Sequence, residues 1–128
     1  MASRSLSNAH PVLVEKFEAA LKKFKVEGRI ITITCTHRST QEQQGLYAQG
    51  RTKPGPIVTK VDGVTKLSKH NYFPSQAIDF AVVVHGKISW DPAEYEEFGA
   101  LCEAEGLEWG GRWIALKDYP HIELKSRD

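Results

Sequence analysis

Hydrophobic and polar residues follow two different periods along this chain, and the change of period separates expected helices from expected strands. Between residues 11 and 27, apolar side chains recur every three or four positions, which is typical of one buried helix face. These side chains are Leu13, Phe17, Ala20, Leu21 and Phe24. Asn8 or Ser7 can cap the helix and Gly28 can end it. The pattern therefore predicts an amphipathic helix near the start of the chain.

The next segments switch between a period of two and a short helical pattern. RIITITCT, residues 29–36, alternates isoleucine and cysteine with arginine and threonine, as expected for a half-buried strand. In STQEQQGLYAQG, Ser39 and Glu42 have the spacing of a capping box and Gly50 can close a short helix. Residues 51–67 hold glycine, proline, lysine and threonine without a clear period, so we expect a long surface loop.

The second half of the chain predicts a hairpin and another helix. AIDFAVVVHGKISW, residues 77–90, has the composition of two strands joined by a turn at residues 85–87. DPAEYEEFGALCEAEG, residues 91–106, begins with Asp91 as a cap and a proline in the first helical position, and it ends at Gly106. We therefore expect the helix to begin directly after the hairpin.

LEWGGRW and YPHIEL predict two further short strands, flanked by a Gly-Gly turn and by Lys117-Asp118. The order of elements indicates an α+β fold, a small antiparallel sheet with helices packed against it. The length of 128 residues falls in the usual range for one domain, and no repeat or linker divides the chain. We therefore expect a single domain over residues 1–128.

Composition narrows the choice of partners and compartment. With 17 Lys and Arg against 16 Asp and Glu, the net charge is +1 and no charged block favours nucleic acid or a membrane surface. The N-terminal residues lack the apolar run of a secretory signal, and no window approaches the roughly 20 apolar residues of a membrane span. We expect a protein kept in the cytosol or exported by a route that the sequence does not encode. In that compartment Cys35 and Cys102 are expected to be buried thiols.

The first candidate for chemistry lies in SKHNYFPSQAIDFA, where His70 precedes Asp79 by nine residues. Asp79 stands between two apolar residues of an expected strand. A carboxylate there either faces water or needs a partner that offsets its desolvation, and a metal ion would do so. A lone histidine beside an apolar run is more often a surface or hydrogen-bonded side chain, so this motif is not specific by itself.

The second candidate is DYPHIEL, where Asp118 stands three residues before His121. Pro120 favours an extended backbone at the residue before it, so both side chains belong to a loop that runs into a strand. Two histidines and one carboxylate make a three-ligand zinc site with an open fourth position, the arrangement of a catalytic zinc. A further carboxylate nearby could act as a base.

Together and in order, these motifs resemble the zinc D,D-peptidase family. That family includes VanX- and VanY-type dipeptidases and carboxypeptidases and the L-alanyl-D-glutamate peptidases of phage endolysins. Its pattern is S-x-H, a short loop, A-x-D and a later D/E-x-x-H, here matched by Ser68, His70, Ala77, Asp79, Asp118 and His121. TCTHRSTQEQQGLYAQGR resembles the family segment that carries a substrate arginine, and WGGRW with DYPHIEL resembles the C-terminal motif. The likeness thus extends over most of the chain.

The sequence departs from the family pattern in one loop. Many members have an interval of seven residues between the histidine and the aspartate, with a glycine in it, whereas this chain has an interval of nine with Pro74 and Ser75. Enlarging a surface loop by two residues costs little free energy and keeps the strand register after it. The change could still reshape the rim of the pocket.

The resemblance implies a Hedgehog/D,D-peptidase-like fold and one zinc ion per chain. The implied zinc ligands are His70, Asp79 and His121, with Asp118 as general base. It also implies that Arg38 faces the substrate, where a guanidinium stabilises developing negative charge. From the residues alone, a surface pair between Arg38 and Glu42 is an equal alternative.

The activity implied by this resemblance is hydrolysis of the L-alanyl-D-glutamate amide bond in the peptide stem of peptidoglycan. We expect a phage endolysin-like monomer, held in the host cytosol until another factor opens the membrane. A D-alanyl-D-alanine carboxypeptidase or dipeptidase would use the same zinc site. A non-catalytic zinc-containing wall-binding module is the third alternative, although such a module has no need of Asp118 as a base.

Other polar and aromatic residues carry two interpretations each. Ser68 can contact substrate or a ligand, or it can cap a turn. Trp109, Trp113 and Tyr119 can form a wall against which a peptide or sugar packs, or they can fill the core. The role of each depends on which side of the sheet its segment faces.

Three histidines and one glutamate complete the candidate residues. Glu123 either supports a metal ligand or is solvated. His37 lies near Arg38 and could reach the site. We expect His10 and His85 at the surface.

Overall fold

The structure is a computed structural model of the chain and describes residues 2–125. Its centre is one five-stranded sheet in which β1, β2, β5 and β4 are neighbours in that order and β3 also pairs with β2. All pairings are antiparallel. The strands are β1 Arg29–Cys35, β2 Ala77–Val84, β3 Lys87–Ser89, β4 Leu107–Trp109 and β5 His121–Leu124. The expected α+β fold with a small antiparallel sheet is therefore confirmed.

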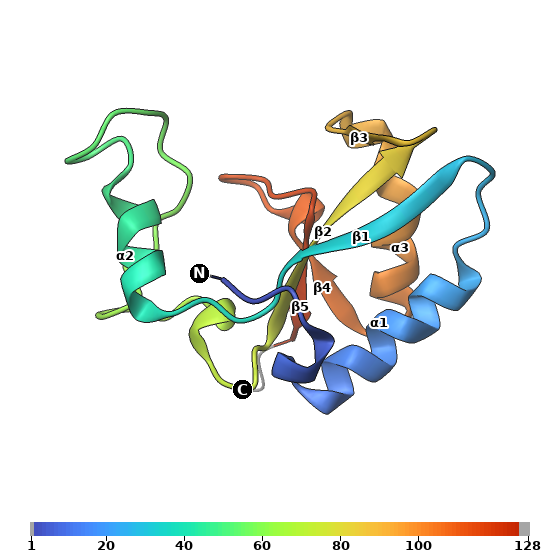
Figure 1. The fold of residues 1–128 in the computed structure, drawn as a ribbon, viewed down its shortest axis with the longest axis horizontal. Helices are drawn as coiled ribbons and strands as arrows, with labels where there is room; N and C mark the ends of the chain where they lie inside the picture. Colours follow the sequence, from blue (N-terminus) through green and yellow to red (C-terminus); the bar gives the residue numbers. More distant parts are fainter. Residues whose placement is uncertain (1, 126–128) are drawn as a thin grey trace.

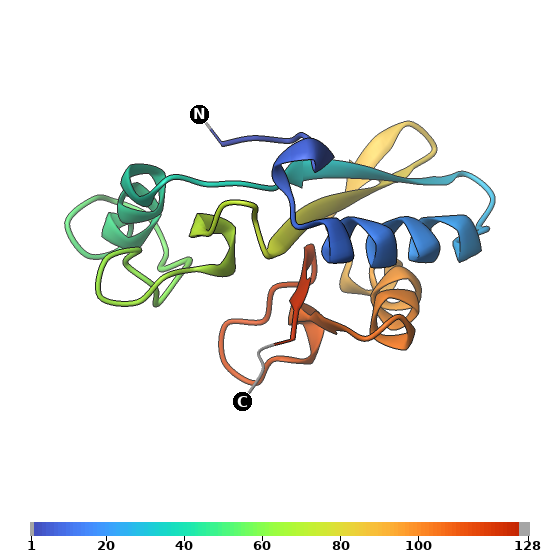
Figure 2. The same ribbon diagram turned by 90° about the horizontal axis from the view of Figure 1, so that it is seen from below.

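One face of the sheet is covered by two helices, α1 Pro11–Lys23 and α3 Glu96–Ala104 (Figures 1 and 2). The period of two in β2 turns Ile78, Phe80 and Val82 toward these helices, and all three are fully buried. The ring of Phe98 in α3 meets the ring of Phe80 edge-on at 5.0 Å between centroids. The same alternation turns Asp79 to the opposite face of the sheet.

The first helix is shorter than its apolar pattern predicted. It ends at Lys23 rather than near residue 27, because Phe24 adopts an extended backbone and packs its ring on Phe98. The expected cap is also wrong. His10 caps the helix, its Nδ1 accepting the N–H of Val12 at 3.1 Å, whereas Ser7 and Asn8 lie in the short 3-10 helix η1 Leu6–Asn8.

Two other segments differ from their expected form. The Asp91 cap is present, but it begins the 3-10 turn η3 Pro92–Glu94, and the α-helix starts only at residue 96. In LEWGGRW the strand stops at Trp109 and the 3-10 turn η4 Gly110–Arg112 follows. Gly110 lies against the backbone of Asp118: a Cβ at Gly110 would be 2.3 Å from that residue's carbonyl oxygen. Only glycine allows this approach, which brings Asp118 beside the sheet.

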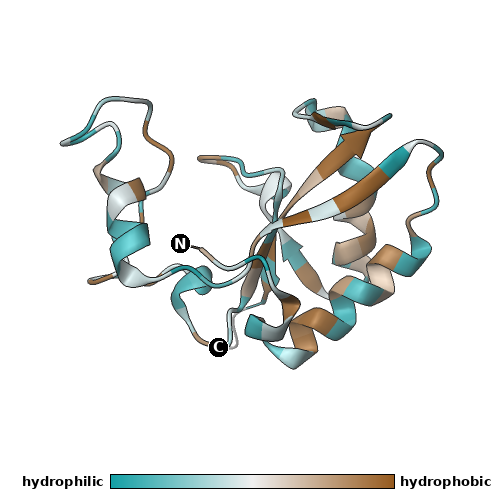
Figure 3. Cartoon of the chain, viewed as in Figure 1, coloured by the Kyte–Doolittle hydropathy of each residue, from teal (hydrophilic) through white to brown (hydrophobic). Residues whose placement is uncertain are grey.

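The helix α2 Thr40–Ala48 and residues 51–67 form a separate lobe, with the sheet between them and α1 and α3 (Figures 1 and 2). The capping box is confirmed, since Ser39 accepts the N–H of Glu42 and Glu42 accepts the N–H of Ser39. Hydrophobic residues concentrate on the central strands and not on α2, which is mostly hydrophilic (Figure 3). Polar contacts therefore have a large share in holding this lobe.

Cys35 and Cys102 are both buried free thiols. Among residues 2–125 there is no helix that combines the length and the apolar character needed to cross a membrane.

Candidate metal centre

The two ligand motifs meet because β2 and β5 are paired. Asp79 of β2 lies directly opposite His121, the first residue of β5, in the antiparallel register. His70 comes from η2 Lys69–Asn71, a 3-10 turn that packs beside these strands. Ser68 caps this turn, accepting the N–H of His70 at 3.2 Å. Two neighbouring elements, η2 and β2, and the distant strand β5 thus bring the three predicted ligand side chains to one place.

The ligand atoms converge on one oxygen of Asp79. Its Oδ1 lies 3.1 Å from Nε2 of His70 and 2.9 Å from Nδ1 of His121. The two imidazole rings are 5.2 Å apart between centroids. His70 is 2% exposed and His121 is 5% exposed, so water does not separate them from the carboxylate.

The hydrogen bonds on the far side of each ring determine which nitrogen is free. Nδ1 of His70 lies 2.7 Å from the carbonyl oxygen of Thr36, which can only accept, so Nδ1 carries the proton. Its Nε2 is fully buried and is the one such side-chain atom in the described chain without a hydrogen-bond partner. Nε2 of His121 lies 2.8 Å from Oε1 of Glu123 and Nδ1 lies 2.9 Å from Oδ1 of Asp79, so a neutral ring that donates to Glu123 has its lone pair on Nδ1, toward Asp79.

When both imidazoles are neutral, as they are when they bind a metal ion, each directs a lone pair at the same carboxylate oxygen. Oδ1 of Asp79 then faces a lone pair about 3 Å away on each side, and these acceptor pairs repel unless a cation binds among them. Two nitrogens and one carboxylate oxygen are also the donor set that zinc prefers. The residues present therefore fit a divalent metal ion.

The ionisation of the site also favours positive charge. Burial lowers the pKa of His70, but the negative charge of Asp79 outweighs it and raises the pKa to about 9. Burial likewise lowers the pKa of His121, while hydrogen bonds to Asp79 and Glu123 raise it to about 10. The pKa of Asp79 is lowered by the imidazoles despite its burial. A metal ion bound by neutral imidazoles would balance the negative charge of Asp79 in the same way as the two protons do.

Asp118 stands at the edge of this cluster. Its Oδ2 lies 3.7 Å from Nδ1 of His121, and its side chain is 42% exposed. Partial burial raises the pKa of Asp118 above its ordinary value, and the negative charge of Asp79 adds to the rise. A carboxylate that is next to the ligands and also open to water can exchange a proton with a molecule at the site.

Arg38 points into the site rather than along the surface. Its Nη2 lies 3.4 Å from Oδ2 of Asp79 and 3.8 Å from Sγ of Cys35, and its Nη1 donates to Oε1 of Gln43 at 2.9 Å. Glu42, the alternative partner considered from the sequence, contributes its carboxylate to the capping box of α2. Arg38 therefore faces the predicted ligand side chains, and its contact with substrate stays a prediction.

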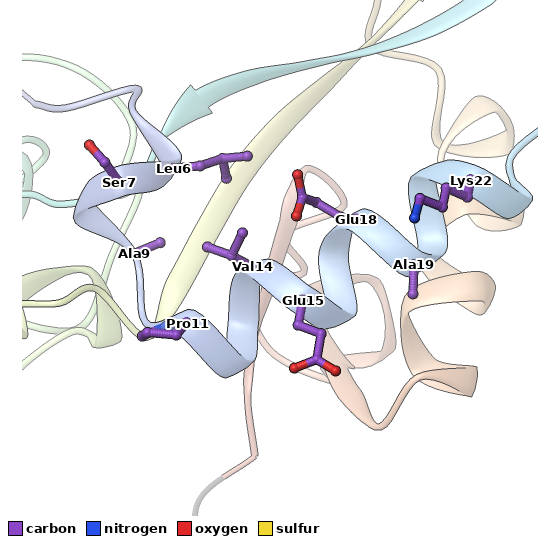
Figure 4. Close-up of a pocket in the computed structure, with 9 residues that line it drawn as sticks. All are labelled: Leu6, Ser7, Ala9, Pro11, Val14, Glu15, Glu18, Ala19 and Lys22. Atoms are coloured by element: carbon purple, nitrogen blue, oxygen red, sulfur yellow. The ribbon is translucent and has the colours of Figure 1, made fainter.

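The site opens into a cleft of about 1150 Å³ between the lobe and the segment before β5. Ser68 and Trp113 line this cleft, and the ring of Trp113 lies 5.1 Å from that of His121. A second hollow, of about 550 Å³, runs along α1 (Figure 4). The residues lining it are aliphatic side chains, a serine, a proline, a lysine and two glutamates, without a histidine or cysteine. The first cleft is therefore where chemistry is expected.

Two aromatic residues expected as possible substrate contacts lie elsewhere. Trp109 is 1% exposed and belongs to the core, and its indole N–H donates to the carbonyl oxygen of Tyr119 at 2.8 Å. Tyr119 packs its ring against Trp109 and is not among the residues that line the cleft. These contacts favour core filling, the other interpretation that the sequence allowed for both residues.

The remaining histidines lie away from the metal cluster. His37 packs edge-on against Phe73 and does not line the cleft. His85 is exposed in the hairpin turn. His10, expected at the surface, is half-buried as the cap of α1.

Several residues of the site have no motif that would identify them in the sequence. The carbonyl of Thr36 acts through the backbone, so any residue type could supply it. Gln43 is a polar residue in a polar helix. Lys69 lies 3.3 Å from Oε2 of Glu123, and it donates to the carbonyl oxygen of Leu124. Only its place beside His70 could have drawn attention to it.

Comparisons with known proteins agree with this geometry. A peptidase M15 family model described as D-alanyl-D-alanine carboxypeptidase matches residues 62–124. The peptidoglycan L-alanyl-D-glutamate endopeptidase CwlK of Bacillus subtilis is 38% identical, over 92% of this chain and 74% of that protein. The L-alanyl-D-glutamate peptidase of Listeria phage A118 is 25% identical, over 98% of this chain and 42% of that protein.

A solved structure supports the same assignment. The L-Ala D-Glu endopeptidase ChiX of Serratia marcescens superposes with a TM-score of 0.73 and 25% sequence identity, over 98% of this chain and 89% of that one. The fold and the convergent ligand residues define a metallopeptidase. The chain belongs to the peptidase M15 family.

Proposed function

We propose that this protein is a zinc endopeptidase that hydrolyses the L-alanyl-D-glutamate amide bond of peptidoglycan stem peptides. The observation that carries the proposal is the convergence of His70, Asp79 and His121 on one point, with Asp118 at its open side. The names of the relatives CwlK, ChiX and the phage peptidase support the choice of bond. The proposed ion is one zinc per chain.

The proposed ligands are Nε2 of His70, a carboxylate oxygen of Asp79 and Nδ1 of His121. Zinc at these ligands supplies a Lewis acid that lowers the pKa of a water molecule to about 7. Asp118 accepts the proton of the attacking water while the water oxygen bonds to the carbonyl carbon of L-alanine. The protonated carboxyl group then returns the proton to the nitrogen of D-glutamate as the C–N bond breaks.

Arg38 and the residues lining the cleft orient the substrate in this scheme. The guanidinium of Arg38 lies 3.4 Å from Asp79, close enough to stabilise negative charge that develops on the carbonyl oxygen. Trp113 and Ser68 line the cleft and are proposed to contact the stem peptide. Trp113 offers a broad apolar surface with its N–H held by Glu108 at 3.0 Å.

The description of the family model supports a D-alanyl-D-alanine carboxypeptidase as a second candidate. Such an enzyme binds the end of a stem peptide. The relatives CwlK, ChiX and the phage peptidase are instead all named for the L-alanyl-D-glutamate bond. The endopeptidase is therefore the preferred function.

The test is digestion of purified Gram-negative peptidoglycan by the zinc-loaded protein, with and without a chelator, followed by mass spectrometry. Chelator-sensitive release of peptides that begin at D-glutamate is the expected result. Release of terminal D-alanine alone would identify a carboxypeptidase. If the folded, zinc-loaded protein cleaves nothing, the non-catalytic wall-binding module becomes the preferred function.

Substitution of the base separates catalysis from metal binding. Asp118→Ala should retain one zinc ion and lose about 10²- to 10⁴-fold in kcat, the usual contribution of a general base. Glu97→Gln, on the exposed side of α3, is the matched control and should cleave like the natural protein. A fully active Asp118→Ala variant would remove Asp118 from the mechanism.

Two finer expectations also stay as proposals. We propose that the enzyme acts as a monomer, which light scattering after size-exclusion chromatography would test. We also propose that it is held in the host cytosol until another factor opens the membrane. Fractionation of expressing cells before and after permeabilisation would test that location, and activity in the medium of intact cells would contradict it.

A further inference from the structure

The lobe formed by α2 and residues 51–67 is held to the site by a buried amide. Among the residues of α2, all within the described part of the chain, Gln43 alone is buried, at 1% exposure. A helix usually buries an apolar stripe, and a buried amide is costly unless its hydrogen bonds are made. This position therefore has a specific polar environment.

Both ends of the Gln43 amide have partners. Its oxygen accepts from Nη1 of Arg38 at 2.9 Å. Its nitrogen donates to the carbonyl oxygen of Val61 at 2.9 Å and lies 3.5 Å from Oγ1 of Thr59. Because the amide has one acceptor and one donor end, this pairing fixes its orientation. Gln43 consequently joins the substrate-facing arginine to the loop that forms the opposite cleft wall.

The backbone and the side chain of Arg38 are held from different directions. The N–H of Arg38 donates to the carbonyl of His70 at 2.9 Å, and Asn71 donates to the carbonyl of Arg38 at 2.9 Å. The guanidinium is held by Gln43 on one nitrogen, while the other faces Asp79. The backbone contacts therefore fix where Arg38 lies, and the hydrogen bond with Gln43 fixes the direction of its guanidinium.

The loop depends on the same residue from its own side. Thr59 and Val61 line the cleft, and Gly63, at φ +80°, packs so closely that an added Cβ would be 2.9 Å from Cβ and Cγ of Gln43. The described core cluster includes no residue of the range 51–67. Polar contacts such as that of Gln43 with Val61 therefore carry much of the placement of this wall.

We propose that Gln43 is a positioning residue for the peptidase reaction. It holds the guanidinium of Arg38 and the Thr59–Val61 wall as one unit, so that a stem peptide bound against the wall has its scissile carbonyl in register with that charge. This inference rests on the proposed function and assigns to it a residue that acts through Arg38 and the loop.

Two variants and a control separate the two hydrogen bonds of the Gln43 amide, one with Arg38 and one with Val61. Gln43→Leu removes both hydrogen bonds at similar side-chain volume. Gln43→Glu keeps an acceptor for Arg38 but loses the donor to the Val61 carbonyl. Gln44→Leu, at an exposed position of the same helix, is the matched control. The readouts are kcat and KM on a soluble stem peptide, hydrogen exchange of the amides of residues 57–67, and zinc affinity.

Gln43→Leu should lose up to about 100-fold in kcat/KM, with a fall in kcat, because misplacement of a catalytic group by about 1 Å can cost that much. Exchange in the loop should accelerate, while exchange in β2 and zinc affinity stay at their natural values. Gln43→Glu should show the faster loop exchange and a raised KM but recover most of kcat. Gln44→Leu should change none of these quantities.

The outcomes distinguish this inference from the function on which it rests. If the natural protein releases no peptide, the proposed function fails and the positioning role fails with it. If the natural protein cleaves and Gln43→Leu matches it in kcat, KM and loop exchange, the function stands and the role of Gln43 is overturned. If β2 exchange rises together with loop exchange, Gln43 is a general stability residue, which also contradicts the proposal.

Discussion

His121 donates its Nε2–H to Oε1 of Glu123, two residues along the same strand, at 2.8 Å. Alternation in β5 places both side chains on one face of the sheet, so the strand itself builds the pair. Lys69 lies 3.3 Å from the other oxygen of Glu123 and balances its charge. The ring of His121 is therefore held with Nδ1 toward Asp79 before any metal ion arrives.

Loss of Glu123 should weaken metal binding. Because the glutamate fixes the tautomer of His121, Glu123→Ala should lower zinc affinity by about 10- to 100-fold, and Glu123→Gln by less, since its amide oxygen still accepts the hydrogen bond. Competition with a chromophoric chelator measures both affinities. Glu97→Gln, at an exposed position, should bind zinc normally, and an unchanged affinity of Glu123→Ala would contradict this role.

The ligand set predicts which histidine substitution removes the metal. His70→Ala should lose stoichiometric zinc after dialysis, because the buried lone pair of Nε2 disappears with the ring. His85→Ala, exposed in the hairpin turn, should retain one zinc ion per chain. Elemental analysis of both purified variants gives the ratio, and equal zinc contents would refute the ligand assignment.

The two tryptophans on either side of Gly110 and Gly111 should behave oppositely. Trp109→Ala opens a cavity in the core and should reduce the free energy of unfolding by about 3–5 kcal/mol. Trp113→Ala removes a cleft residue and should raise KM with a smaller loss of stability. Urea unfolding and peptide kinetics measure the two effects. A stability loss for Trp113→Ala as large as that for Trp109→Ala would contradict this division.

Asp62 should make the loop sensitive to acid. Its carboxylate accepts the hydroxyl of Thr65 and the backbone N–H groups of Val64, Lys66 and Thr65, which lower its pKa from 3.8 to about 2. Because the folded pKa is below the unfolded one, its stabilisation is complete above about pH 4 and is lost as the pH falls through about 2.

NMR titration of the Asp62 side-chain carbonyl carbon checks this expectation. A midpoint near 2 is expected in the natural protein, and Thr65→Val should move it upward because the hydroxyl is the largest cause of the shift. A midpoint at the ordinary value of 3.8 in the natural protein would show that these hydrogen bonds do not persist in solution.

Local patterns accounted for much of the fold. The period of two in β2 correctly separated the buried Ile78 and Phe80 from Asp79 on the other face, and the Ser39–Glu42 capping box correctly began α2. Both features depend on residues within a few positions of one another. Where the outcome depended on a distant contact, the expectation missed: the first helix ends early where Phe24 leaves it to pack on Phe98.

The sequence by itself determined the antiparallel α+β architecture and the residue types of the proposed metal site, since periods, caps and the ligand motif are all local. Only the tertiary structure decided how those residues are oriented. The carbonyl of Thr36 selects the tautomer of His70 across 34 positions, and Gln43 aims Arg38 while holding Val61. These contacts depend on the distance and direction between groups that are far apart in the sequence. They therefore produce no hydrophobic period and no sequence motif.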